Sequence, residues 1–202
     1  TLASTIDSYD TINGGGTTGM TLASGASINV DAGEIAGMLA DESLGRLTID
    51  DQVITVNSAA TISVDTANLL EATTTGVVTA SIATTEAVSE LNTLTGTNGA
   101  YTIVVAAGDA TTTTAAQLNT LNGKTTVAVD LTNVTALAGS NLSDLETLAS
   151  SINANEFSND SGLTTIAVTD TTIDATTLAS TIDSYDTISA GITDMTLASG
   201  AT

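Results

Sequence analysis

The chain has 202 residues and contains no cysteine, no histidine and no proline. Without cysteine and histidine it cannot form disulfides, thiolate nucleophiles, Ser-His triads or the ordinary zinc and haem sites. Without proline, its turns must be made by Gly, Asn, Asp and Ser. We therefore expect neither a cofactor nor a resident metal, although weak calcium binding to the acidic surface stays open.

Basic and aromatic residues are also scarce. Arg46 and Lys124 are the only cations beside 23 acidic residues, so the formal net charge is −21. Phosphate backbones and anionic lipids are bound chiefly by Lys and Arg, which excludes nucleic acid and anionic membranes as partners. Aromatics make up 2% of the chain, whereas hydrophobic residues make up 42% and Thr supplies 42 residues. Such a core of small and β-branched side chains suits thin, regular layers and β-structure.

What is present is a repeat. The twelve residues 1–12 return without a mismatch as 177–188, and Met20 to Ala26 return as Met195 to Ala201. Weaker echoes lie between them, the best being Glu90 to Leu94 against Gln117 to Leu121. Units of about 20–50 residues are typical of repeat architectures. The predicted unit anchors are Leu2, Ile35, Leu69, Leu91, Leu118, Leu145 and Leu178.

Hydrophobic periodicity predicts a short helix followed by one or two short strands in each unit. Helices are expected over residues 1–12, 35–39, 65–70, 86–94, 114–121, 142–152 and 177–188, with Asp31, Asp65, Ser143 and Asp174 at their starts. Strands are expected within 20–30 and over 47–50, 53–56, 61–64, 77–82, 101–106, 125–131, 163–168 and 171–173, and a polar loop over 153–162.

Strands joined by helical crossovers imply parallel pairing. The sequence therefore predicts an α/β repeat solenoid, a right-handed parallel β-solenoid or β-roll with one short helix per coil. Whether the helix lies outside the roll or is enclosed by the strands stays open, although the small helices around Leu91 and Leu118 favour enclosure. Residues 1–202 are expected to form one continuous segment of about six units, truncated at both ends. A leucine-rich-repeat-like horseshoe is the alternative, although its sequence signature is missing.

Two sets of acidic residues are candidates for chemistry. Asp31, Asp65 and Asp174 each follow a strand-like triplet, where helix capping explains them better than a calcium ladder. Asp7, Asp10, Asp183 and Asp186 flank Tyr9 and Tyr185 in the repeated phrase, and a solvated helix face explains them better than paired acid–base catalysis. No catalytic, cofactor-binding or metal-binding residue is assigned.

Two kinds of polar motif in the chain do not by themselves indicate a function. Threonine pairs such as Thr125-Thr126 and Thr164-Thr165, with the run Thr111 to Thr114, suggest an ice-binding face but lack a constant spacing. The glycosylation sequons at Asn133, Asn141 and Asn159 are close to chance in a chain this rich in Ser and Thr.

The segments 115–123 and 171–178 resemble phrases of very large repetitive proteins of cyanobacteria, which are secreted or surface-exposed. That resemblance implies a structural role outside the cell and transfers no functional residues. We expect a non-enzymatic structural array whose open strand edges join head to tail with further copies of the chain. The alternative is a calcium-dependent or glycan-binding adhesive module. Ice binding and a polysaccharide lyase are more remote, since a lyase needs basic groups and Arg46 and Lys124 fall in different units.

Overall fold

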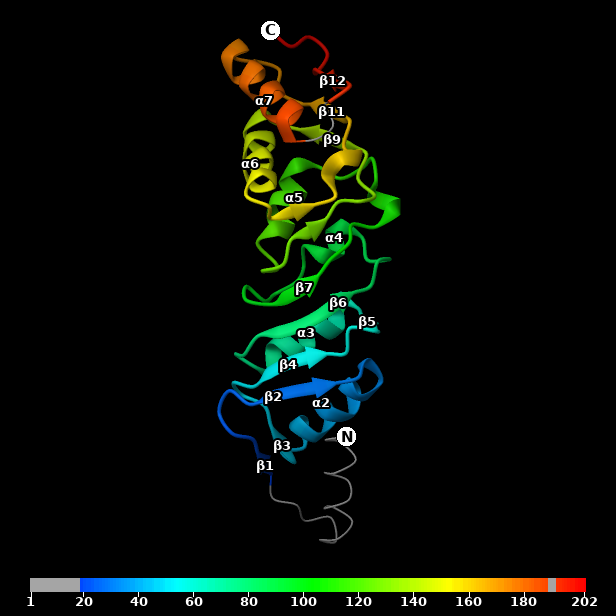
Figure 1. Cartoon of the computed structure of the whole chain (residues 1–202), viewed down its shortest axis with the longest axis vertical. Coiled ribbons are helices and arrows are strands. Elements are labelled where there is room, and N and C mark those ends of the chain that lie inside the picture. The colour runs from blue at the N-terminus through cyan, green and yellow to red at the C-terminus, as the bar shows by residue number, and fades with distance from the viewer. Residues whose placement is uncertain (1–18, 189–191) are drawn as a thin grey trace.

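The computed structural model describes residues 19–188 and 192–202, which form an elongated molecule (Figure 1). The chain advances along the long axis, with β1 towards one end and β12 at the other. Its helices are α2 (Ile35–Ser43), α3 (Val64–Thr73), α4 (Val88–Leu91), α5 (Ala115–Asn122), α6 (Leu142–Asn153) and α7 (Ala175–Ile188), with 3-10 turns η1 (Ala32–Glu34), η2 (Ala107–Asp109) and η3 (Asp160–Gly162). We call a unit one helix together with the strands that precede it.

Every strand pair in the described part of the chain is parallel, which confirms the predicted pairing mode. Register partners lie 20 residues apart for Thr61 and Ser81, and up to 29 apart for Thr165 and Asp194. The strands are β1 (Met20–Thr21), β2 (Ser27–Val30), β3 (Leu47–Thr48), β4 (Val53–Val56), β5 (Thr61–Ile62), β6 (Val78–Ile82), β7 (Ala100–Thr102), β8 (Val129–Asp130), β9 (Ala136–Ser140), β10 (Phe157–Ser158), β11 (Thr165–Val168) and β12 (Asp194–Thr196).

The prediction of a single right-handed β-solenoid is wrong. The described strands form four separate parallel sheets, β1-β3, β8-β10, β9-β11-β12 and a five-stranded sheet of β2, β4, β6, β5 and β7. Between the five-stranded sheet and the sheet of β8 and β10, an isolated parallel bridge joins Val104 to Asp130. Residues 19–188 and 192–202 form a small mixed α/β domain of six α-helices and several short sheets. A leucine-rich-repeat horseshoe also needs one continuous sheet, so the alternative fails for the same reason.

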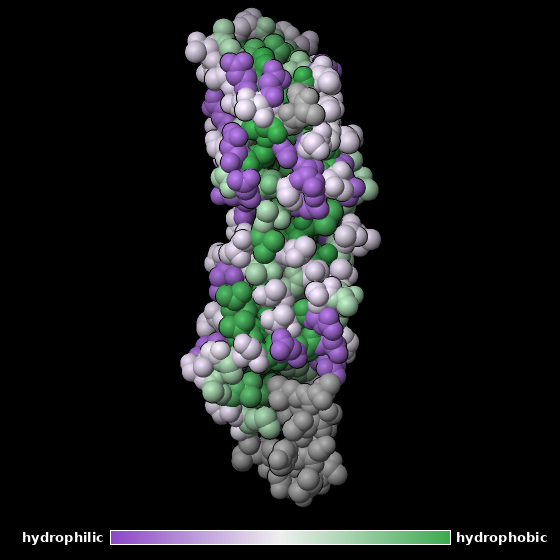
Figure 2. Space-filling model, viewed as in Figure 1, coloured by the Kyte–Doolittle hydropathy of each residue, from purple (hydrophilic) through white to green (hydrophobic). Residues whose placement is uncertain are grey.

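The helices are not enclosed by strands, so that expectation is also wrong. Helix α5 buries Ala115, Leu118 and Leu121 but exposes Ala116 and Thr120, and α3 and α6 are divided in the same way. A helix with one apolar stripe and one polar face covers a core from outside. On the face shown in Figure 2, hydrophobic side chains reach the surface in small patches scattered among polar ones.

The core repeats one pattern along α3 to α6, in which three apolar side chains spaced at i, i+3 and i+6 point inward, the third of the α4 set lying just beyond that helix. Leu69, which the sequence predicted as an anchor, is 56% exposed, whereas Leu70 is fully buried. Ala67 takes the position that Leu91, Leu118 and Leu145 take elsewhere. The buried triads are Val64, Ala67 and Leu70; Val88, Leu91 and Leu94; Ala115, Leu118 and Leu121; and Leu142, Leu145 and Leu148.

Several strand predictions were wrong in extent or place. The strand expected over 125–131 is reduced to β8, with Val127 37% exposed, and residues 171–173 form no strand. The predicted polar loop contains β10, where Phe157 is buried, and β9 was not predicted at all. Helix α4 is shorter than residues 86–94. These segments take their conformation from neighbouring units, which local periodicity does not report.

Candidate functional site

The most regular feature of the molecule is a set of hydrogen bonds from the start of each helix to the next unit. In four successive helices the first helical N–H donates to a side chain that lies 21 to 28 residues further on. These bonds satisfy amides that a helix leaves unpaired. They are Val64 to Glu86 Oε1 (3.3 Å), Val88 to Asp109 Oδ2 (2.9 Å), Ala115 to Ser140 Oγ (2.9 Å) and Leu142 to Asp170 Oδ2 (2.8 Å).

Asparagine side chains connect the same helices a second time. Asn68, Asn92 and Asn119 each donate from Nδ2 to a backbone carbonyl of the following unit, at 3.1, 3.2 and 3.0 Å. The acceptors belong to Thr93, Gln117 and Asp144. Helix α3, the end of α4 and helix α5 are therefore each joined to the following unit by a second side-chain hydrogen bond.

A third series runs through threonines at a constant spacing of 29 residues. The N–H and hydroxyl of Thr164 both donate to the carbonyl of Thr135, and those of Thr193 both donate to the carbonyl of Thr164. These hydroxyls bond the backbone of the preceding unit. Such a threonine braces the stack, and this use differs from the hydroxyl lattice that ice binding would need.

One predicted helix cap is confirmed and three are wrong. Asp174 Oδ1 accepts hydrogen bonds from the N–H groups of Thr177 (2.9 Å) and Thr176 (3.0 Å), which lower the pKa of this carboxyl. Asp31 makes no cap bond, because η1 separates it from α2. Asp65 and Ser143 lie inside the first turns of α3 and α6, whose caps are both two residues earlier, at Ser63 and Asn141.

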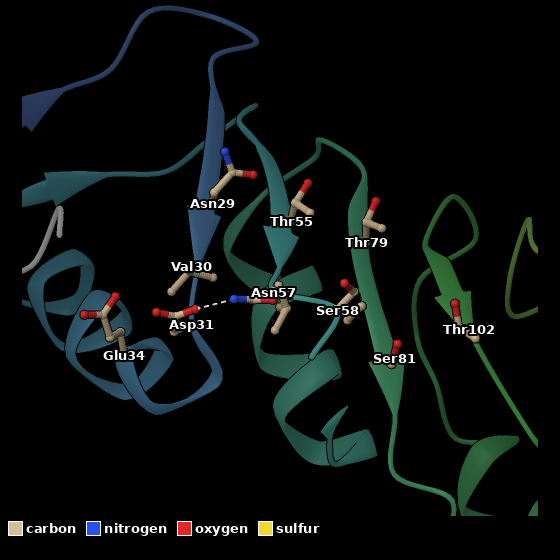
Figure 3. Close-up of a pocket in the computed structure, with 12 residues that line it drawn as sticks. Asn29, Val30, Asp31, Glu34, Thr55, Asn57, Ser58, Thr79, Ser81 and Thr102 are labelled. Atoms are coloured by element: carbon tan, nitrogen blue, oxygen red, sulfur yellow. Dashed lines mark hydrogen bonds between the residues drawn. The ribbon is translucent and has the colours of Figure 1, made fainter. Parts of the chain in front are cut away.

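A groove of about 570 Å³ lies on the outer face of the five-stranded sheet, and Figure 3 shows the residues that line it. Asn29, Thr55 and Thr79 occupy register positions on neighbouring strands β2, β4 and β6 and form one polar row across it. Ser81 and Thr102 are register partners that continue the polar lining along β6 and β7. Parallel strands lie about 4.8 Å apart, so these rows present hydrogen-bonding groups at that interval.

The groove is acidic at one end. Asp31 and Glu34 lie beside each other there, on the turn that leads from β2 into α2. Asn57 Nδ2 donates to Asp31 Oδ1 at 2.9 Å, and Asn57 Oδ1 accepts from the N–H of Ala59 at 3.1 Å. Asn57 is thus fixed at both ends of its amide and holds the Asp31 carboxylate in place. The sequence indicated Asp31 as a cap and gave no sign of the groove.

The buried polar groups elsewhere are structural. The hydroxyl of Tyr101 donates to Glu71 Oε1 at 2.6 Å, and that of Tyr185 donates to the carbonyl of Leu145 at 2.9 Å. Both tyrosine side chains are fully buried, and this burial raises the pKa of each phenol. Arg46 pairs with the buried Asp41 at 2.6 Å.

The acidic sets singled out from the sequence do not converge on one site. Asp183 and Asp186 are exposed on α7 while Tyr185 points into the core, and Asp7, Tyr9 and Asp10 lie outside the described residues. Within residues 19–188 and 192–202, no cluster of three or more acidic side chains is placed to hold a metal ion. In that same part of the chain, no helix combines the length and apolar character needed to span a bilayer.

Comparison with known proteins adds no assignment. No protein-family model matches the chain, no curated protein matches it, and no solved structure matches its fold.

Proposed function

We propose that this chain is a structural segment of a repetitive extracellular or cell-surface protein, and that copies of it associate head to tail. The observation that carries the proposal is the recurrence of the same unit-to-unit bonds along the molecule, from Val64 to Glu86 through Leu142 to Asp170. Such bonds serve to stack units in series. The resemblance to secreted repetitive proteins supports a location outside the cell.

Head-to-tail association needs an edge that can accept another strand, and β12 provides one. It pairs with β11 through Thr165 and Asp194, Ile166 and Met195, and is the edge strand of its three-stranded sheet. The N–H of Asp194 donates inward to Thr164 at 3.2 Å. Thr193, just before β12, donates to the same carbonyl, and within β12 the N–H groups alternate in direction, so the N–H of Met195 points outward and can bond a second copy.

The test is negative-stain electron microscopy of the whole chain in buffer with a chelator, comparing the wild type with Met195→Pro. Proline removes the outward N–H and leaves the inward bond of Asp194 in place. The control is Ser199→Pro, which lies in the turn from Ala198 to Ala201 ahead of Gly200 at φ +79, where proline fits.

Wild type and Ser199→Pro should form filaments of uniform width, and Met195→Pro should give short particles. Discrete short particles from the wild type at every concentration would overturn the proposal of self-association. Filaments that persist in Met195→Pro would show that another surface makes the contact.

A further inference from the structure

The stacking of units does not explain the polar lining of the groove on the five-stranded sheet. Its polar row consists of Asn29, Thr55 and Thr79, which lie on three neighbouring strands and point out of the sheet (Figure 3). Thr55 and Thr79 are half-buried and Asn29 is exposed. A concave surface lined by amide and hydroxyl groups can bond a polyhydroxylated ligand at several points along its length.

The charge of the groove selects among such ligands. Its lining contains Asp31 and Glu34 and no basic residue, within a chain of net charge −21. Acidic polysaccharides are therefore repelled, whereas a ligand with ammonium groups is attracted over a distance of about 10 Å at moderate salt. The lining also contains no aromatic ring on which a sugar could stack, so hydrogen bonds and charge must supply the affinity.

The position of Asp31 and Glu34 also favours a ligand with ammonium groups. The bond of Asn57 to Asp31 holds one carboxylate at the end of the polar row, and Glu34 lies next to it. A carboxylate already fixed in place loses little side-chain entropy when a cation binds, which favours the ion pair.

We propose that this groove binds a linear amine-bearing oligosaccharide, whose ammonium groups lie against Asp31 and Glu34 and whose hydroxyls bond Asn29, Thr55 and Thr79. The proposal is independent of head-to-tail association, because the groove lies on β2, β4 and β6 and the proposed assembly contact is β12.

The experiment is titration of the whole chain with glucosamine oligomers, followed by calorimetry and by NMR chemical shifts. The comparison ligand is the N-acetylated oligomer of the same length, which keeps the hydroxyls and lacks the positive charge. The variants are Asp31→Asn and Thr55→Val at the groove. The matched control is Asp183→Asn, which removes the same charge from an exposed position on α7.

We expect the glucosamine oligomer to bind and to shift the Asn57 side-chain amide, and the acetylated oligomer to bind much more weakly. Asp31→Asn should weaken binding by about fivefold, a typical effect for one partly exposed ion pair, and should reduce its salt dependence. Thr55→Val should weaken binding by a similar factor, and Asp183→Asn should leave it unchanged.

Equal losses in Asp31→Asn and Asp183→Asn would mean diffuse attraction to an acidic protein and would overturn the site. Equal affinity for the two oligomers would overturn the role of the ammonium groups. Unchanged far-ultraviolet circular dichroism and urea midpoints in the variants ensure that a loss of binding reports on the groove.

Discussion

The two buried tyrosines predict how the domain loses stability in alkali. The phenols of Tyr101 and Tyr185 are fully buried and donate hydrogen bonds to Glu71 and Leu145, so burial raises the pKa of both in the folded state. In the unfolded chain each phenol titrates near pH 10. Above that pH the unfolded state binds fewer protons than the folded state, and the free energy of unfolding therefore falls as the pH rises.

The size of the loss follows from linkage. A phenol that ionises at about pH 10 only when unfolded removes about 1.4 kcal/mol of stability at about pH 11, so the two tyrosines together remove about 3 kcal/mol. Below pH 10 this contribution is fully retained. Replacing one tyrosine by phenylalanine costs a hydrogen bond at neutral pH but removes one share of the alkaline loss.

Urea unfolding at about pH 9 and about pH 11, followed by circular dichroism, measures this difference. Between the two pH values, the decrease in the free energy of unfolding should be about 1.4 kcal/mol smaller in each single variant, Tyr101→Phe and Tyr185→Phe, than in the wild type. Tyr9 is present in every variant, so its share cancels in the comparison. An identical drop in wild type and both variants, or ultraviolet titration of both phenols near pH 10 in the folded protein, would refute the reasoning.

Further predictions concern the packing of the core, the caps of the helices and a glycine that lies close to a backbone carbonyl. Leu118→Ala, at a fully buried position, should cost about 2–5 kcal/mol in urea unfolding, whereas Leu69→Ala should change stability by less than about 0.5 kcal/mol. Asp170→Ala should lower the free energy of unfolding by about 1 kcal/mol, because it leaves the Leu142 N–H without its acceptor. The control is Asp186→Ala on the exposed face of α7, and equal effects of the two substitutions would disprove the unit-to-unit cap. Gly76→Ala drives Cβ into the Gln52 carbonyl oxygen and should cost about 1–3 kcal/mol, unlike Gly33→Ala, where nothing lies within 4 Å. Because the cap bonds lower the pKa of Asp174 in the folded state, this residue stabilises the fold fully above the usual pKa of 3.8, and the stabilisation is lost as the pH falls through the lower folded pKa. The melting temperature of Asp174→Asn should therefore fall less in acid than that of the wild type.

The candidate groove could not be predicted from the sequence. Asp31 was visible in the sequence as an acidic residue after a strand, but its predicted cap bond is replaced by the bond from Asn57, 26 residues away. Asn29, Thr55 and Thr79 each occupy an ordinary polar position in an alternating strand. Only the pairing of β2 with β4 and of β4 with β6 brings them into one row.

The sequence by itself determined the helices with their inward triads, such as Leu142, Leu145 and Leu148, and the parallel direction of the strand pairs. Both depend on local periodicity and on the helical connection between strands, which are properties of neighbouring residues. The tertiary structure alone decided which strands join, the shifts of 20 to 29 residues between them and their division into four sheets. The register of a strand pair depends on which side chains of the two units are buried together. Strands of two to five residues contain too few alternating positions for the sequence to specify the partner strand.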